Sequence, residues 1–202
     1  MGESITKESI IAKALQCIDE IYPMSDDTYN DAFFPVEKFY EEAIRWAVDN
    51  APSRILGEGT TLPTIGINKE GMFNDVVVLD ISQYSFGRLL RFMLKGWKTK
   101  PLIIYDTDAR YAQMANPVLR GKPSHPIVAI CDNKTRLEAY SMPATAEEIE
   151  VASATYMPYD AEYFTIDMAD IAAWRLAELV FLSISDANSA TICASHLQEL
   201  VQ

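Results

Sequence analysis

The sequence predicts an α+β fold in which helices from the two ends of the chain form a helical core around an inserted, mostly β lobe. Three observations predict it. Both ends carry apolar residues with the period of an amphipathic helix, and the middle consists of shorter apolar runs separated by prolines and glycines. Within that middle part, two apolar runs flank a short polar turn, which is typical of a β-hairpin. The expected organisation is an N-terminal helical hairpin over 1–52, the inserted lobe over 53–158 and C-terminal helices over 159–202.

Two helices are expected in the N-terminal part. Residues 6–22 place their apolar side chains on one face, and Thr6 is the expected N-cap. A polar, turn-rich stretch follows, and Pro35 then stands where the first position of a helix tolerates proline. The second apolar face continues until Pro52 ends this helix.

The inserted lobe is expected to be built mainly from strands. The segments with strand character are 75–82, 102–105, the hairpin 126–142 and 150–156.

One segment of the lobe has the spacing of a helix instead. Apolar side chains at Phe86, Leu89 and Met93 predict a short helix that ends at Gly96 as its C-cap. The stretch 111–117 is expected to be an irregular connection.

The last fifty or so residues return to the helical pattern. Residues 171–184 carry a stripe with Trp174, Phe181 and Ile184, and further apolar residues extend it to nearly all faces. Such a helix is expected to be central to a core or shared between subunits. A final helix is expected after Asp186.

The charge and composition exclude several classes of protein. The formal net charge is −12, so the average surface repels phosphate, and conventional nucleic-acid binding is disfavoured. With 49% hydrophobic and 23% charged residues, extensive disorder is not expected. No apolar stretch reaches the roughly 20 residues of a membrane span, and the N-terminus has no secretory signal pattern. We therefore expect no membrane partner and maturation in a cytoplasm.

Motifs for catalysis, cofactors or metals are weak. His125 and His196 are the only histidines, and no Gly-x-Ser-x-Gly elbow presents a serine. The glycines at 57 and 59 lack the rest of a phosphate loop, the acidic residues at 26, 27 and 31 lack an EF-hand pattern, and the three widely spaced cysteines form no CxxC pair. We expect no enzyme, no catalytic residue, no cofactor and no metal. A pocket around His125 would need Tyr105, Asp106 or Asp108.

A basic group is the most distinctive charged feature. Five of the seventeen positive charges fall within thirteen residues, at Arg88, Arg91, Lys95, Lys98 and Lys100. The first three have helical spacing and are expected to form one basic stripe. The stripe is interpreted as a solvated helix face, as a contact for an acidic neighbouring subunit, or as a contact for DNA phosphate.

Three stretches together suggest a family. The first is FGRLLRFMLKGW at 86–97, and the second is NPVLRGKPSHPIVA at 116–129 with the returning strand LEAYSMP at 137–143. The third is a long apolar helix over 172–182 followed by DANSA at 186–190. In this order they resemble ring or connector proteins of crAss-like and related Bacteroidetes phages, which sit beneath the portal.

The resemblance implies a structural virion protein without catalysis, located in the portal–tail region and assembled in the host cytoplasm. It implies a twelve-fold ring that matches the portal and contacts neighbouring ring or tail proteins, with the genome DNA only passing through the channel. It also implies a helical core with a β lobe, and a subunit that often stays monomeric until the portal templates it. The strong acidity suits a channel wall to which phosphate must not bind.

A closed ring needs two different contact faces on each subunit. Trp174, Phe181 and Ile184 are the candidates for one face, and the basic stripe is the candidate for contact with an acidic partner. Two other classes remain open: a small bacterial ligand-binding or hydrolytic domain, and a monomeric accessory protein that docks through the basic stripe.

Overall fold

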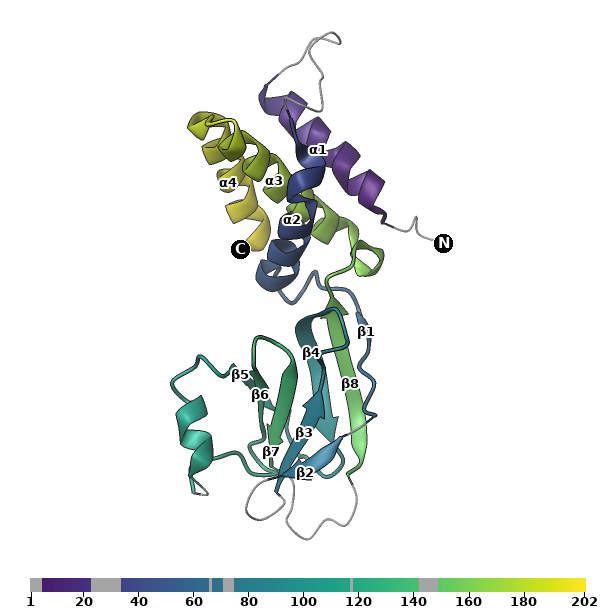
Figure 1. The fold of residues 1–202 in the computed structure, drawn as a ribbon, viewed down its shortest axis with the longest axis vertical. Helices are drawn as coiled ribbons and strands as arrows, with labels where there is room; N and C mark the ends of the chain where they lie inside the picture. The colour runs from purple at the N-terminus through teal and green to yellow at the C-terminus, as the bar shows by residue number, and fades with distance from the viewer. Residues whose placement is uncertain (1–4, 23–33, 66, 71–74, 117, 142–148) are drawn as a thin grey trace. The chain divides into compact units, whose positions relative to one another are not determined.

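In the computed structural model, which describes residues 5–22, 34–65, 67–70, 75–116, 118–141 and 149–202, the chain has four α-helices and two β-sheets. The α+β class with helices at both ends is confirmed. The chain divides into two compact units, drawn in Figure 1. A helical unit comprises residues 1–58 and 159–202, and a β unit comprises residues 59–158. The first division thus falls six residues after the expected boundary at 52, and the second falls where it was expected.

The N-terminal helices of the helical unit begin at the capping residues. α1 (Lys7–Ile21) begins after Thr6, whose Oγ1 accepts a 3.2 Å hydrogen bond from the backbone N–H of Ser9. The Ser9 hydroxyl accepts a 2.9 Å bond from the Thr6 N–H in return, so two of the otherwise unpaired N–H groups are satisfied. α2 (Val36–Asn50) follows Pro35, which lies at the N-cap, one position before the expected one. Both predicted helices are confirmed.

The centre of the helical unit is α3 (Ile166–Ser183), which contacts α1, α2 and the last helix, α4 (Ala187–Val201). α3 has buried residues on nearly every side because it is surrounded by the other helices. It begins five residues before the predicted segment, since Thr165 caps it by accepting a 3.2 Å bond from the Met168 N–H. Among the described helices, none combines the length and the apolar character needed to cross a bilayer.

The β unit contains two sheets. One has the strand order β1-β8-β4 and the other has the order β2-β3-β7-β6-β5. The strands are β1 (Thr60–Thr61), β2 (Asn68–Glu70), β3 (Val76–Asp80), β4 (Phe86–Leu94), β5 (Leu102–Tyr105), β6 (Ile127–Cys131), β7 (Arg136–Tyr140) and β8 (Val151–Pro158). All neighbouring pairs are antiparallel except β5 and β6, which are parallel and are joined through a 3₁₀ helix, Tyr111–Ala115. The strands predicted at 75–82, 102–105 and 150–156 are confirmed.

The predicted hairpin is β6 and β7. Its turn contains Asp132, Asn133 and Lys134, which all have positive φ angles of 53°, 54° and 66°. Asparagine and aspartate adopt this left-handed conformation more readily than most residues, because their short side chains bond locally to the backbone. The polar turn therefore sets the register in which Ile130 pairs with Leu137.

The helix predicted over residues 86–94 is wrong, because this segment is strand β4. The pairing of β4 with β8 shifts register three times, between Phe86 and Arg88, Leu89 and Arg91, and Met93 and Leu94. Each irregularity interrupts the two-residue alternation of a strand, so buried side chains recur at spacings of two and three residues. That spacing imitates the period of a helix. Gly96, with φ of 92°, ends the strand in a turn and not a helix.

Two apolar clusters hold the β unit together. The larger one combines side chains of both sheets, including Leu79, Val128 and Leu137 of the five-stranded sheet and Phe92 and Tyr156 of the three-stranded sheet. The smaller one comprises Val76, Ile104, Met114, Ala129, Cys131 and Tyr140, and the 3₁₀ helix supplies Met114 to it. Alternate residues of β6 enter the two clusters, as expected for a strand that is covered on both faces.

Candidate functional site

The outer edge of β4 is the longest sheet edge among the described strands of the β unit. Among the described strands, β4 pairs only with β8, so its other side has no strand neighbour. It is nine residues long, whereas the other strands that end a sheet, β1, β2 and β5, have two, three and four residues. Long sheet edges are sites where another chain can add, unless charges or irregularities prevent it. The β4 edge has both charges and register shifts, which oppose the addition of another strand, so its side chains are the more suitable contact surface.

A cavity of about 230 Å³ lies beside this edge. Residues 90–93 of β4 line one part of it, and Lys100, Pro101 and Ile103, at the start of β5, line the other. Pockets that bind small molecules usually enclose about 300–1,000 Å³. This cavity is therefore better suited to one or two anchoring side chains of a protein partner, and we refer to it as the β4–β5 cavity.

The β4–β5 cavity is electropositive. Arg91 and Lys100 line it and are exposed, and no acidic side chain is among its lining residues. Within the described part of the chain, neither cation forms an ion pair with a carboxylate. Lys98 in the preceding turn is also exposed. The remaining lining is apolar, so the cavity combines positive charge with an apolar wall.

The structure does not bring the predicted basic stripe together. Arg88 is half-buried and Arg91 is exposed at the cavity, on a strand and not on one face of a helix. Lys95 forms an ion pair and hydrogen bond with Glu150, which raises the pKa of Lys95 above its ordinary value. The three cations do not share one face, because the segment that carries Arg88 and Arg91 is a strand and not the predicted helix. Only Arg91 of the three predicted cations lines the β4–β5 cavity.

The three apolar residues proposed for subunit contact have different environments. Phe181 is fully buried in the helical unit, so the structure places it in the core and not on a contact face. Trp174 is half-buried and stacks on His196, with 4.3 Å between the ring centroids. Ile184 is half-buried at the C-cap of α3. The large apolar side chains exposed on this unit are others: Tyr22, Tyr163, Ile166, Leu182 and Ile192.

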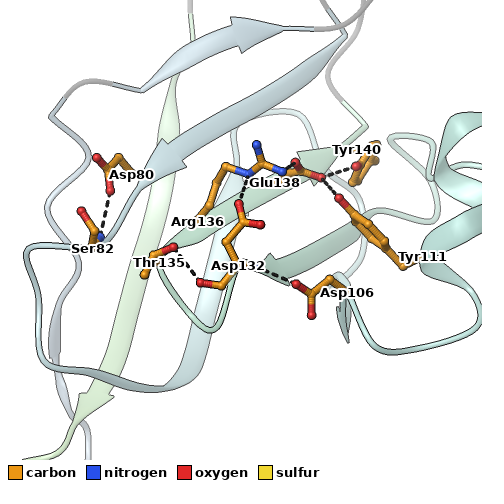
Figure 2. A network of polar contacts seen from close by, with 9 residues as sticks. All are labelled: Asp80, Ser82, Asp106, Tyr111, Asp132, Thr135, Arg136, Glu138 and Tyr140. Carbon is orange, nitrogen blue, oxygen red and sulfur yellow. Dashed lines mark hydrogen bonds and ion pairs between the residues drawn. The ribbon is translucent and has the colours of Figure 1, made fainter.

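A network of polar and titratable side chains on the five-stranded sheet surrounds Glu138 (Figure 2). Glu138 is buried on β7, and its Oε2 accepts hydrogen bonds from the hydroxyls of Tyr111 (3.1 Å) and Tyr140. Its Oε1 lies 2.7 Å from Nη2 of Arg136, and Nε of Arg136 lies 3.1 Å from Oδ2 of Asp132. Both carboxylate oxygens are therefore engaged by neighbours.

The contacts of this network indicate a structural role for Glu138. Burial and the bond to Glu138 raise the pKa of Tyr140, and burial chiefly raises the pKa of Tyr111, so both phenols remain protonated donors. Tyr111 belongs to the 3₁₀ helix between β5 and β6, and its bond to Glu138 ties that helix to the sheet. Two phenols and a guanidinium therefore hold the Glu138 carboxylate in place within the sheet.

We expect the substitution Tyr140→Phe to lower the free energy of unfolding by about 2 kcal/mol, because hydrogen bonds to charged groups contribute about 1.5–3 kcal/mol. Urea unfolding followed by circular dichroism measures the change. Tyr105→Phe is the matched control, since Tyr105 lies on β5 and is 39% exposed. Equal midpoints for the two variants would show that the network does not stabilise the fold.

The groups around His125 do not form a catalytic arrangement. Nδ1 of His125 lies 3.0 Å from the hydroxyl of Ser124. Asp106 instead accepts a 2.7 Å bond from the N–H of Asp132. Asp108 is bound by the guanidinium of Arg110, which lowers the pKa of Asp108 to about 2. Each candidate acid is therefore committed to a partner other than the histidine.

The described residues also offer few groups for metal binding or thiol chemistry. The described residues contain no group of three histidine, cysteine or acidic side chains that could hold a metal ion, and the acidic positions 26, 27 and 31 lie outside the described residues. Cys17, Cys131 and Cys193 are buried free thiols. Burial raises the pKa to about 11 for the first two and to about 12 for Cys193, so at neutral pH these thiols are protonated and unreactive.

The chain matches no protein-family model, no curated protein and no solved structure. A functional assignment therefore depends on the surfaces of the protein itself. The surface that sequence reasoning missed is the β4–β5 cavity. The one local signal was the run of lysines between 95 and 100, immediately before a predicted strand.

A second missed feature is the separation of charge between the units. The helical unit contains 19 acidic and 6 basic residues, a formal charge of −13. The β unit contains 10 acidic and 11 basic residues, a formal charge of +1. The net charge of −12 therefore belongs to the helical unit, and most of the basic residues belong to the β unit.

Proposed function

We propose that this chain is a non-enzymatic structural subunit of a head-to-tail connector ring between the portal and the tail of a tailed bacteriophage. The observation that carries the proposal is the separation of charge, −13 on the helical unit and +1 on the β unit. A closed ring of identical subunits is held by a contact between two different faces of each chain. One chain that has an acidic unit and an electropositive cavity on its other unit meets that requirement.

Electrostatic attraction between unlike faces also favours the correct partner. Complementary charge accelerates encounter, and the juxtaposition of like charges costs several kcal/mol at an interface, which suppresses wrong pairings. Two helical units repel one another, whereas a helical unit and the β4–β5 cavity attract. Identical chains are therefore biased toward head-to-tail contact and away from symmetric pairs.

The acidic helical unit also suits a channel for DNA. A surface of the same sign as phosphate does not retain the genome as it passes. The resemblance of residues 80–202, approximately, to crAss-like phage ring proteins supports the same role. On this proposal the ring contains twelve subunits and contacts the portal and other ring or tail proteins. The protein is then part of the virion, in the portal–tail region, and assembles in the host cytoplasm.

The test is electron microscopy of the full chain mixed with the portal protein encoded in the same genome. We expect rings of twelve copies on the portal and no rings on a portal of an unrelated phage. Sedimentation of the mixture gives the number of chains that each portal retains. A chain that remains monomeric in the presence of intact portals, even when it is in large molar excess over them, would overturn the proposal and favour a monomeric docking protein.

A further inference from the structure

A short segment of the helical unit carries exposed apolar and acidic side chains together. Residues 160–167 contain the 3₁₀ helix Ala161–Tyr163 and the start of α3. Ile166 is 69% exposed and Tyr163 is 37% exposed. Glu162 and Asp167 are exposed beside them. Of the large apolar side chains exposed in the described part of this unit, Ile166 is the most exposed.

The segment is held in one conformation before any partner binds. Phe164 and Ala161 are buried, and the hydroxyl of Thr165 donates a 2.8 Å bond to the carbonyl of Ile55. The carboxylate of Asp160 accepts a 3.1 Å bond from the N–H of Glu162. An exposed apolar residue on a fixed backbone loses little conformational entropy when it is buried by a partner.

The β4–β5 cavity has the complementary chemistry. It is lined by apolar side chains that include Leu90 and Ile103, and by the cations Arg91 and Lys100. Its volume of about 230 Å³ admits an anchoring side chain. Interfaces derive most of their affinity from a few such anchors in pockets, with charged pairs around them.

We propose that the β4–β5 cavity of one copy receives the 160–167 segment of a second copy. Ile166 is the anchor in the cavity, and Glu162 and Asp167 face Arg91 and Lys100. This inference rests on the proposed function, because it assigns the head-to-tail contact of the ring. The charge of −13 on the helical unit makes a second copy of this chain a better occupant than a basic protein. The apolar part of the lining favours an apolar protein side chain over a nucleic acid, which would engage only the two cations.

Charge reversal with rescue tests the contact. In R91E/K100E both faces are acidic, and in E162K/D167K both faces are basic. Each variant alone is expected to lose at least tenfold of the chains retained on the portal. An equimolar mixture is expected to restore retention, because each face then finds an opposite partner on the other variant. R110E/K122E is the control, with the same charge change at exposed β-unit residues outside the cavity lining. Because R110E also breaks the ion pair with Asp108, its unfolding midpoint is measured together with its retention.

A disulfide crosslink tests the contact directly, in mixtures with and without the portal. The single substitutions I166C and M93C are made in separate full-length chains, in which the native cysteines are buried. Mild oxidation of the mixture is expected to give a covalent dimer that neither variant gives alone in the same amount. Ile192→Cys replaces Ile166→Cys in the control, since Ile192 is also exposed, at 46%.

The outcomes separate the two proposals. A crosslink that requires mixing, together with rescue by mixing, supports the contact. Absence of the crosslink, or retention of both charge variants at the wild-type level, overturns it and leaves the connector role intact. If wild-type chains form no ring on the portal while the crosslink forms, the connector role fails and the contact stands.

Discussion

Replacing Phe181 with alanine is expected to lower the free energy of unfolding by about 3–5 kcal/mol, the range measured for truncation of buried aromatic side chains. Phe181 is fully buried in α3, which contacts the three other helices. Removal of the ring deletes apolar contacts and leaves a void that the surrounding helices fill only in part. A loss of this size approaches the whole stability of a small domain. Thermal and urea unfolding of the purified chain measure it.

The neighbouring residue provides the control. Leu182 is 52% exposed on the same helix, so Leu182→Ala is expected to change the free energy of unfolding by less than about 0.5 kcal/mol. The comparison also separates a core role from a contact role for Phe181. If Phe181→Ala left stability unchanged and abolished assembly alone, Phe181 would be a contact residue and its burial in the helical unit would be misassigned.

Replacing Gly59 with alanine is expected to destabilise the β unit by about 3 kcal/mol, at the upper end of what most single substitutions cost. A Cβ at this position would lie 2.3 Å from the carbonyl oxygen of Tyr156 and 2.7 Å from Cδ1 of Leu90. Gly59 also has φ of 64°, a left-handed conformation that costs other residues about 1–2 kcal/mol. The carbonyl belongs to β8, which pairs with both β1 and β4, so it cannot move without disturbing the three-stranded sheet.

The substitution Gly96→Ala separates the conformational cost of the positive φ from the cost of the steric clash. It has φ of 92°, yet a Cβ there would meet no atom within 4 Å. Gly96→Ala is therefore expected to cost only the conformational part, about 1 kcal/mol. Denaturant unfolding of both variants gives the difference, which we assign to the clash at Tyr156. Equal losses for the two variants would show that the backbone moves away from the added Cβ at little cost.

These stability measurements also bear on the assembly experiments. R91E/K100E changes exposed side chains and should retain the wild-type unfolding midpoint. E162K/D167K also changes exposed side chains, but Asp167 lies in the first turn of α3, so a loss of about 1 kcal/mol is expected there and is measured beside the assembly defect. Phe181→Ala and Gly59→Ala reduce assembly only by depleting the folded chain. A defect of assembly without a defect of stability is thus the signature of a lost contact.

The elements that the sequence predicted are those governed by local rules. The Thr6 cap satisfies an N–H group three residues away, so this helix start can be recognised from nearby residues. The Thr165 cap follows the same rule but was missed, and the start of α3 was therefore predicted five residues too late. The β6–β7 hairpin depends on a short polar turn in which Asp132 and Asn133 adopt left-handed conformations. The burial of α3 on nearly every side follows from its apolar composition.

The error at β4 has a different origin. Phe86, Leu89 and Met93 satisfy a helical period, and no local residue contradicts it. The strand forms because β8 pairs with it from more than fifty residues away, and the register shifts that accompany this pairing produce the misleading spacing. Tertiary pairing overrides local preference in such segments. The predicted basic stripe was wrong for the same reason, because it required this segment to be a helix.

The α+β class, the terminal helices, the hairpin and the excess of acidic residues can be read from the sequence, because each depends on composition or on residues close together in the chain. The three-dimensional structure was needed to show that Phe181 lies in a core, that Arg91 and Lys100 meet at one cavity, and that the acidic charge belongs to one unit. Those properties arise from contacts between segments that are distant in the chain. Such contacts leave no pattern among neighbouring residues from which they could be predicted.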